Sequence, residues 1–146
     1  MSEPRLAEPP TIPVAIGRLL GKAGWAPLAV LVFHSVIQRT SLRQPLDFTV
    51  HYLGGAAIGF FFFHALECFE RLLGRTTLAG RLLFSYGLAC TGGVFWEFGE
   101  LASDVFRHTH IQVSIHETMS DLIADATGAA TSLAIVFLTT IFGRKR

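Results

Sequence analysis

Hydrophobic residues in this chain are grouped into four long stretches separated by short polar segments. The stretches run over about residues 25–38, 48–66, 82–101 and 119–142, and the first is the shortest. A helix needs about 20 mostly apolar residues to cross the hydrocarbon core of a bilayer. The pattern therefore predicts an all-α membrane protein, a compact bundle of four transmembrane helices.

The segment before the first stretch has a different character. Four prolines lie among the first thirteen residues, without the apolar core of a cleaved signal peptide, which predicts a tail. The following VAIGRLLGKAG is short and basic, as is typical of a helix in the membrane interface. We expect an N-terminal tail and interfacial segment over residues 1–23 and a single four-helix transmembrane domain over residues 24–146.

Small and aromatic residues predict how the helices pack. Gly55 and Gly59 form a small-xxx-small pair in the second stretch, and the fourth stretch begins with the alanine- and glycine-rich ADATGAATS. Such surfaces allow helix backbones to approach closely. The run of four phenylalanines at 60–63 is instead expected to face lipid.

Composition agrees with a membrane protein. Hydrophobic residues make up 51% of the 146 residues and the mean hydropathy is +0.47. Charged residues make up 16%, against roughly a quarter in soluble domains. A net charge of +1 without a basic face argues against a nucleic-acid partner, and the bilayer is the expected one.

The basic residues are unevenly divided between the two sides of the predicted bundle. Only three, at positions 39, 43 and 107, fall on one side. Nine fall on the other: Arg5, Arg18, Lys22, Arg71, Arg75, Arg81, Arg144, Lys145 and Arg146. Lys and Arg are enriched in cytoplasmic segments. We therefore expect both termini in the cytoplasm.

Acidic residues cluster in one window, WEFGELASDVFRHTHIQVSIHETMSDLIAD, which holds six of the eleven acids and three of the six histidines. Two sets in it have helical spacing, so each set would share one helix face: Glu97, Glu100 and Asp104, then Glu117, Asp121 and Asp125. The predicted topology brings Asp47, His51 and His34 to the same membrane side. We expect one outward-facing pocket.

These acids need a balancing charge, because an acid at mid-bilayer costs about 2.5–3.5 kcal/mol on insertion scales. Arg107 is the one basic residue close to them in sequence. Two solutions remain open: carboxyl groups that share protons, or a divalent cation. Carboxylates with histidine suit Zn, Mn or Fe, whereas oxygen ligands alone suit Mg or Ca. The expected metal ligands are His51, Glu97, Glu100, Asp121 and Asp125, and the expected pocket residues are His34, Asp47, Asp104, Gln112 and Glu117.

Three motifs occur in an order that resembles small bacterial membrane proteins of the YjdF type and, more distantly, VanZ-like proteins. They are DFTVH, WEFGE and Q-x-x-x-x-E-T-M-S-D-L-I-A-D-x-x-G-A, within about residues 44–135. Glu117 stands where the pattern leads us to expect aspartate. The resemblance implies the same topology, a location in a bacterial inner membrane and a site at Asp47, His51, Trp96, Glu97, Glu100, Gln112, Asp121, Asp125 and Gly128, and it implies no activity.

Motifs leave the question of enzymatic activity open, because HExxH, GxSxG, Walker A and GxGxxG sequences do not occur. We expect a protein that binds a divalent metal, with Zn, Mn and Mg as candidates. Hydrolysis of a lipid-linked or envelope substrate is an extension of this hypothesis. The alternatives are ion or proton transport, and a structural or assembly subunit. Homo-oligomers and complexes with other membrane proteins both fit these hypotheses.

Overall fold

The computed structural model describes residues 11–112 and 114–143, and these residues form helices and connections without strands. The helices are α1 (Ile12–Leu19), the π-helical turn η1 (Leu20–Gly24), α2 (Trp25–Ile37), α3 (Arg43–Cys68), α4 (Glu70–Leu73), α5 (Leu78–Arg107) and α6 (Ile115–Gly143). The predicted all-α fold is confirmed. The proline-rich tail up to residue 10 and the basic residues at 144–146 lie outside the described residues.

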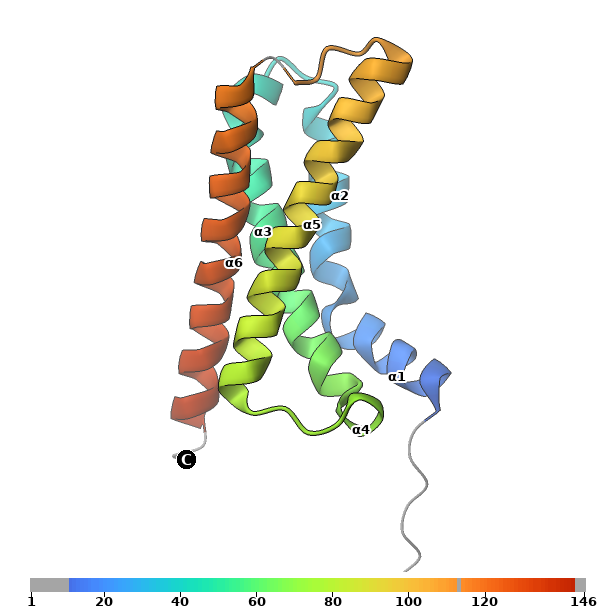
Figure 1. Cartoon of the computed structure of the whole chain (residues 1–146), viewed down its shortest axis with the longest axis vertical. Coiled ribbons are helices and arrows are strands. Elements are labelled where there is room, and N and C mark those ends of the chain that lie inside the picture. The colour runs from blue at the N-terminus through green and yellow to red at the C-terminus, as the bar shows by residue number, and fades with distance from the viewer. Residues whose placement is uncertain (1–10, 113, 144–146) are drawn as a thin grey trace, which may run out of the picture.

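Four helical segments are long and apolar enough to cross a membrane, as predicted: Ile12–Ile37, Arg43–Cys68, Leu78–Arg107 and Ile115–Gly143. The last three extend beyond the predicted stretches because flanking, largely polar residues continue the helices, whereas the first is lengthened by residues before Trp25. The first combines α1, η1 and α2, and Figure 1 shows α1 turning away from the bundle at η1. A π-helical turn commonly marks such a bend. An interfacial position for α1 stays a prediction.

Helix α3 is the central element of the bundle. It packs against α2, α5 and α6, and α5 also packs against α6 (Figure 1). Helix α2 contacts α3 but does not pack closely against α5 or α6 in the described part of the chain. This arrangement leaves space between α2 on one side and α5 and α6 on the other.

Helices α3 and α6 meet along a seam of small residues, as the glycine and alanine pattern predicted. A Cβ atom added at Gly55 would meet the backbone of Asp125, and one added at Gly128 would meet the carbonyl group of Tyr52. A Cβ at Gly59 would lie 3.3 Å from the Cα of Ala129. Because backbone touches backbone, the two helices are held at a fixed separation.

The phenylalanine run corrects one sequence-based expectation. Phe63 is only 4% exposed and forms a core with Leu133 and Val136, whereas lipid-facing positions were expected for the whole run. Consecutive residues on a helix point in different directions, so four neighbours cannot all face lipid. Large side chains are exposed elsewhere on the bundle, as expected for lipid-facing positions.

Candidate metal centre

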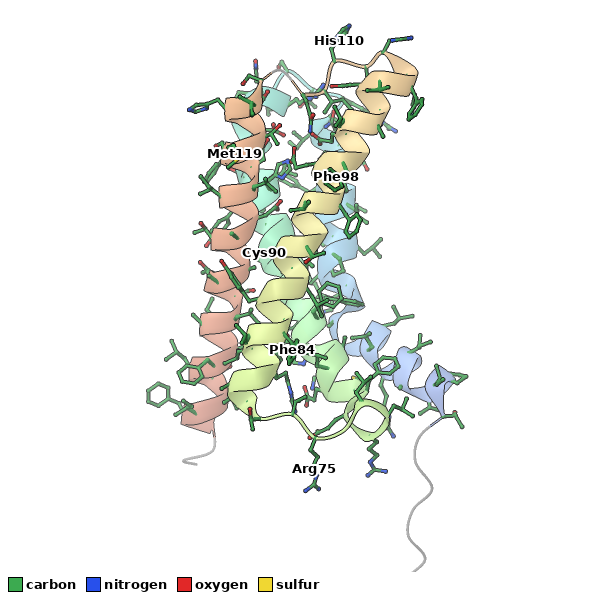
Figure 2. The ribbon with its side chains drawn as sticks, in the orientation of Figure 1. Arg75, Phe84, Cys90, Phe98, His110 and Met119 are labelled. Atoms are coloured by element: carbon green, nitrogen blue, oxygen red, sulfur yellow. The ribbon has the colours of Figure 1, made fainter. Side chains whose placement is uncertain are left out.

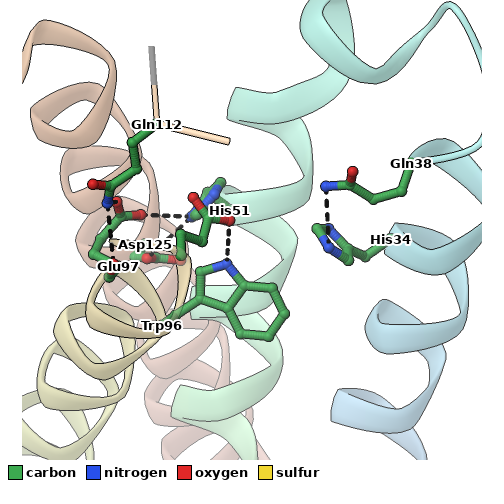
Figure 3. Close-up of polar contacts among 8 residues, drawn as sticks. His34, Gln38, His51, Trp96, Glu97, Gln112 and Asp125 are labelled. Carbon is green, nitrogen blue, oxygen red and sulfur yellow. Dashed lines mark hydrogen bonds and ion pairs between the residues drawn. The ribbon is translucent and has the colours of Figure 1, made fainter. Parts of the chain in front are cut away.

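We call the end of the bundle where α3 and α6 begin and α5 ends the site end, which is at the top of Figure 1. His51 of α3 lies at its centre and is 4% exposed. The His51 Nδ1 atom lies 3.4 Å from Asp125 Oδ2 of α6 and 3.9 Å from Glu97 Oε1 of α5 (Figure 3). Three helices therefore contribute to one buried polar cluster.

A set of ligating atoms suited to a metal lies on α3 and α6. One atom each from Asp47, His51 and Asp121 lies within 4.8 Å of the others. Asp47 precedes His51 by one helical turn, and Asp121 precedes Asp125 by one turn on α6. The close α3–α6 seam turns these two pairs toward each other. His51 and Asp121 are buried and Asp47 is half-buried, so water does not surround the set.

Glu97 has one satisfied and one unsatisfied carboxylate oxygen. Gln112 Nε2 donates to Glu97 Oε2 and to the Glu97 backbone oxygen, each at 3.0 Å (Figure 3). Glu97 Oε1 is buried and has no hydrogen-bond partner among the described residues. Leaving a buried acceptor unpaired is costly. This oxygen therefore indicates a position for a cation, a proton or a water molecule.

Asp104 shapes the connection between α5 and α6. Its carboxylate accepts hydrogen bonds from the backbone nitrogens of Ile111 (2.6 Å) and Gln112 (2.8 Å) and from the Thr109 hydroxyl (2.6 Å). Helix α5 ends at Arg107, and its C-cap residue His108 has a left-handed φ of 55°. These contacts position Gln112 over Glu97. Asp104 thus acts on the cluster through the loop.

The remaining predicted residues surround the centre. Glu100 accepts a hydrogen bond of 2.9 Å from Trp96 Nε1, and His34 of α2 meets the edge of the Trp96 ring at 5.1 Å. His34 is also 3.3 Å from the side-chain nitrogen of Gln38. The family resemblance implies a site residue at Trp96, and its i, i+4 spacing from Glu100 on α5 explains how the two side chains meet.

The structure divides the ten predicted site residues into groups. Asp47, His51 and Asp121 form the set of ligating atoms, and Glu97 and Asp125 contact His51. This places Asp47, expected in the pocket wall, within the ligand set. The others lie around these five: Glu100 at Trp96, His34 at Gln38 and Trp96, Asp104 and Gln112 in the loop, and Glu117 in a groove at the site end.

Two spaces adjoin the centre. A polar groove of about 340 Å³ at the site end is lined by Asp47, Asp121 and Glu117. A cavity of about 270 Å³ lies among α2, α3, α5 and α6, where α2 stands away from α5. Its walls are mostly apolar, and His51 and Asp125 are among its polar lining residues. The ligand set is therefore in contact with both a polar opening and an apolar chamber.

Comparison with known proteins places the chain in a family. Residues 20–141 match the DUF2238 family, described as "Predicted membrane protein". The chain belongs to this family. It is also 30% identical over 92 residues to an uncharacterised protein of Thermotoga maritima, an alignment covering 62% of this chain and 47% of the relative. The chain thus spans about half the length of that relative. No solved structure matches it significantly.

The DUF2238 match covers every residue of the candidate centre, together with α2, α3, α5 and nearly all of α6. It supports the prediction of a membrane protein. The affiliation with YjdF-type proteins, the more distant VanZ-like resemblance, the bacterial inner membrane and the cytoplasmic position of both termini stay predictions.

Proposed function

We propose that this DUF2238 protein binds one divalent metal ion at the site end through Asp47, His51 and Asp121. The observation that carries the proposal is the approach of their ligating atoms to within 4.8 Å of one another. The ligands come from two helices whose backbones touch, so their separation is fixed by packing. A preformed set of this kind favours metal binding over a chance grouping of acids.

The surroundings of His51 support the proposal. Its Nδ1 atom faces Asp125, which leaves Nε2 as the metal-binding nitrogen. A carboxylate on the second ring nitrogen is the usual way to orient a histidine ligand. Two carboxylates balance a doubly charged ion, and no Lys or Arg in the described ranges pairs with Asp47 or Asp121. The imidazole ligand favours Zn or Mn over Mg.

We further propose that the metal activates water for hydrolysis of a lipid-linked substrate. Three protein ligands leave coordination positions for water, and a bound metal lowers the pKa of that water toward neutrality. The polar groove gives water access, while the apolar cavity beside His51 accommodates a hydrocarbon chain. A metal held by Asp47, His51 and Asp121 would supply an activated water, whose oxygen would bond to the carbonyl carbon or the phosphorus as the bond to the leaving oxygen breaks, and the leaving oxygen would take up the proton.

Transport receives less support from the packing. Midway along the bundle the backbones of α3 and α6 touch at Gly55, Gly59 and Gly128, so this seam contains no room for a polar path. An ion flux in proteoliposomes that is abolished by Asp121→Asn would favour transport over hydrolysis.

Metal content tests the proposal directly. The protein, purified in detergent, is stripped with a chelator, dialysed against Zn²⁺ or Mn²⁺ and analysed for metal. We expect about one ion per chain, and background levels for Asp47→Asn, His51→Gln and Asp121→Asn. Glu70→Gln, an acid at the opposite end of the bundle, is the matched control and retains the metal.

Glu100→Gln distinguishes the ligand set seen in the structure from the set expected from sequence. Because Glu100 faces Trp96, this variant keeps its metal if the structural set is correct. Equal, negligible metal in the wild type and Asp121→Asn would refute the site. Hydrolysis is tested separately by phosphate release from farnesyl pyrophosphate, comparing the metal-loaded wild type with His51→Gln. The absence of any difference would argue against hydrolysis of this class of substrate.

A further inference from the structure

A second polar cavity lies at the opposite end of the bundle from the candidate metal centre. It has a volume of about 610 Å³ and is lined by η1, α3, α4, α5, α6 and the connection before α5. Its charged lining residues are Lys22, Glu67, Glu70 and Arg81. Figure 2 shows Arg75 at the same end pointing away from the helices. The cavity is far larger than the roughly 30 Å³ that one water molecule occupies.

Positive and negative charges in this cavity are balanced. Lys22 Nζ lies 2.8 Å and His64 Nδ1 lies 2.9 Å from Glu67 Oε2, and Arg81 Nη2 lies 3.5 Å from Glu70 Oε2. Two basic and two acidic side chains therefore face one space with no formal excess of either sign. Such a lining complements a ligand that itself carries one positive and one negative group.

Two buried polar atoms in the cavity lining lack partners. Arg81 Nε and Thr76 Oγ1 have no hydrogen-bond partner among the described residues. The Arg81 guanidinium lies over the Phe63 ring, 5.5 Å from its centroid, which fixes its position. An arginine N–H can only donate, and a threonine hydroxyl can donate as well. Arg81 Nε therefore requires an acceptor, the Thr76 hydroxyl can donate to the same group, and phosphate oxygens serve both.

The cavity also lies at the depth of lipid headgroups. Helix α3 has 26 residues, which corresponds to about 39 Å at 1.5 Å per residue, longer than the ~30 Å hydrocarbon core. The excess of about 9 Å, divided between the two ends, places about one turn at each end in the headgroup region, and Glu67 lies in the last turn of α3. Phe60, Phe63 and Leu78 add apolar surface to the cavity wall. A polar headgroup attached to an acyl chain matches both parts of the lining.

We propose that this cavity binds the phosphoethanolamine headgroup of a phospholipid. The phosphate accepts hydrogen bonds from Arg81 Nε and Thr76, and the primary ammonium donates to the carboxylates of Glu67 and Glu70. A quaternary choline group has no N–H to donate, and an anionic glycerol headgroup offers no cation to the acids. Phosphatidylethanolamine is therefore the preferred ligand.

Binding of single lipids to delipidated protein, measured by native mass spectrometry, tests the proposal. The probes are dioleoyl phosphatidylethanolamine, phosphatidylcholine and phosphatidylglycerol, with free phosphoethanolamine to separate a lipid from a soluble ligand. We expect phosphatidylethanolamine to bind at least about tenfold more tightly than the other three. Thr76→Val and Arg81→Lys should weaken the binding of all three lipids, because each carries the phosphate, whereas Arg75→Gln, the exposed control at the same end, should leave their affinities unchanged.

Glu67→Gln provides a test that does not depend on loss of binding. Removing one acid leaves the cavity with a net positive charge, so the preference should move from phosphatidylethanolamine toward phosphatidylglycerol. Equal affinity for the three lipids, or no effect of Thr76→Val and Arg81→Lys, would overturn the proposal. Free phosphoethanolamine binding as tightly as the lipid would overturn the assignment to a lipid. Metal content is unchanged in Thr76→Val, which separates this proposal from the metal site.

Discussion

Replacing Gly128 by alanine tests whether the α3–α6 seam sets the geometry of the candidate metal centre. An added Cβ would lie 2.8 Å from the carbonyl carbon of Tyr52 and closer still to its oxygen, whereas ordinary van der Waals contact begins at 3.4 Å. The helices must therefore separate locally by more than about 0.6 Å. Since the obstacle is backbone, no side-chain rotation relieves it.

The separation has two expected consequences. Overpacking typically costs 1–3 kcal/mol, and a clash with backbone places Gly128→Ala near the upper end, at about 3 kcal/mol of unfolding free energy. The gain of up to ~1 kcal/mol in helix propensity from glycine to alanine offsets part of this cost. In addition, Asp121 moves relative to Asp47 and His51, so the affinity for the metal should fall.

Unfolding by SDS, followed by circular dichroism in mild detergent, measures the first effect, and metal titration measures the second. Gly99→Ala is the matched control, because a Cβ at Gly99 of α5 meets no atom within 4 Å. This control should be neutral or slightly stabilising. If Gly128→Ala unfolded at the same SDS concentration as Gly99→Ala and bound metal equally well, close backbone contact would not control the site.

Two further predictions concern residues around the centre. Asp104→Ala removes the acceptor for the backbone nitrogens of Ile111 and Gln112, so both amides should exchange hydrogen faster. Hydrogen exchange followed by mass spectrometry measures this effect. Unchanged exchange would contradict the role of Asp104 in positioning the loop. Trp96→Phe removes one hydrogen bond to Glu100 and should cost about 1 kcal/mol of unfolding free energy without loss of metal, whereas metal loss would show that Glu100 is a ligand.

The candidate site was only partly predictable from its sequence. Helical spacing placed Glu97 and Glu100 together on α5, and Asp121 and Asp125 together on α6, because residues three or four apart share a helix face. Spacing does not fix how one helix is rotated against the next. The structure turns Glu100 toward Trp96, and it brings Asp47 rather than Glu100 within reach of His51 and Asp121.

The cavity at the opposite end of the bundle was even less predictable from the sequence than the candidate metal centre. Lys22, Glu67 and Arg81 lie in separate segments, and only the fold places them around one space. Arg81 had been counted among the basic residues of one membrane side, with no partner assigned. The absence of a hydrogen-bond acceptor for Arg81 Nε among the described residues can be recognised only when the positions of the neighbouring side chains are known.

The all-helical character, the four long apolar helices and the small residues of the α3–α6 seam can be predicted from the amino-acid sequence. These features depend on local composition and on a fixed helical period, which the chain carries from one residue to the next. The acids that contact His51, the burial of Phe63 and the positions of the cavities follow instead from the packing of the helices. Those outcomes depend on rotations and separations between helices, and they are set by contacts between residues distant in the chain.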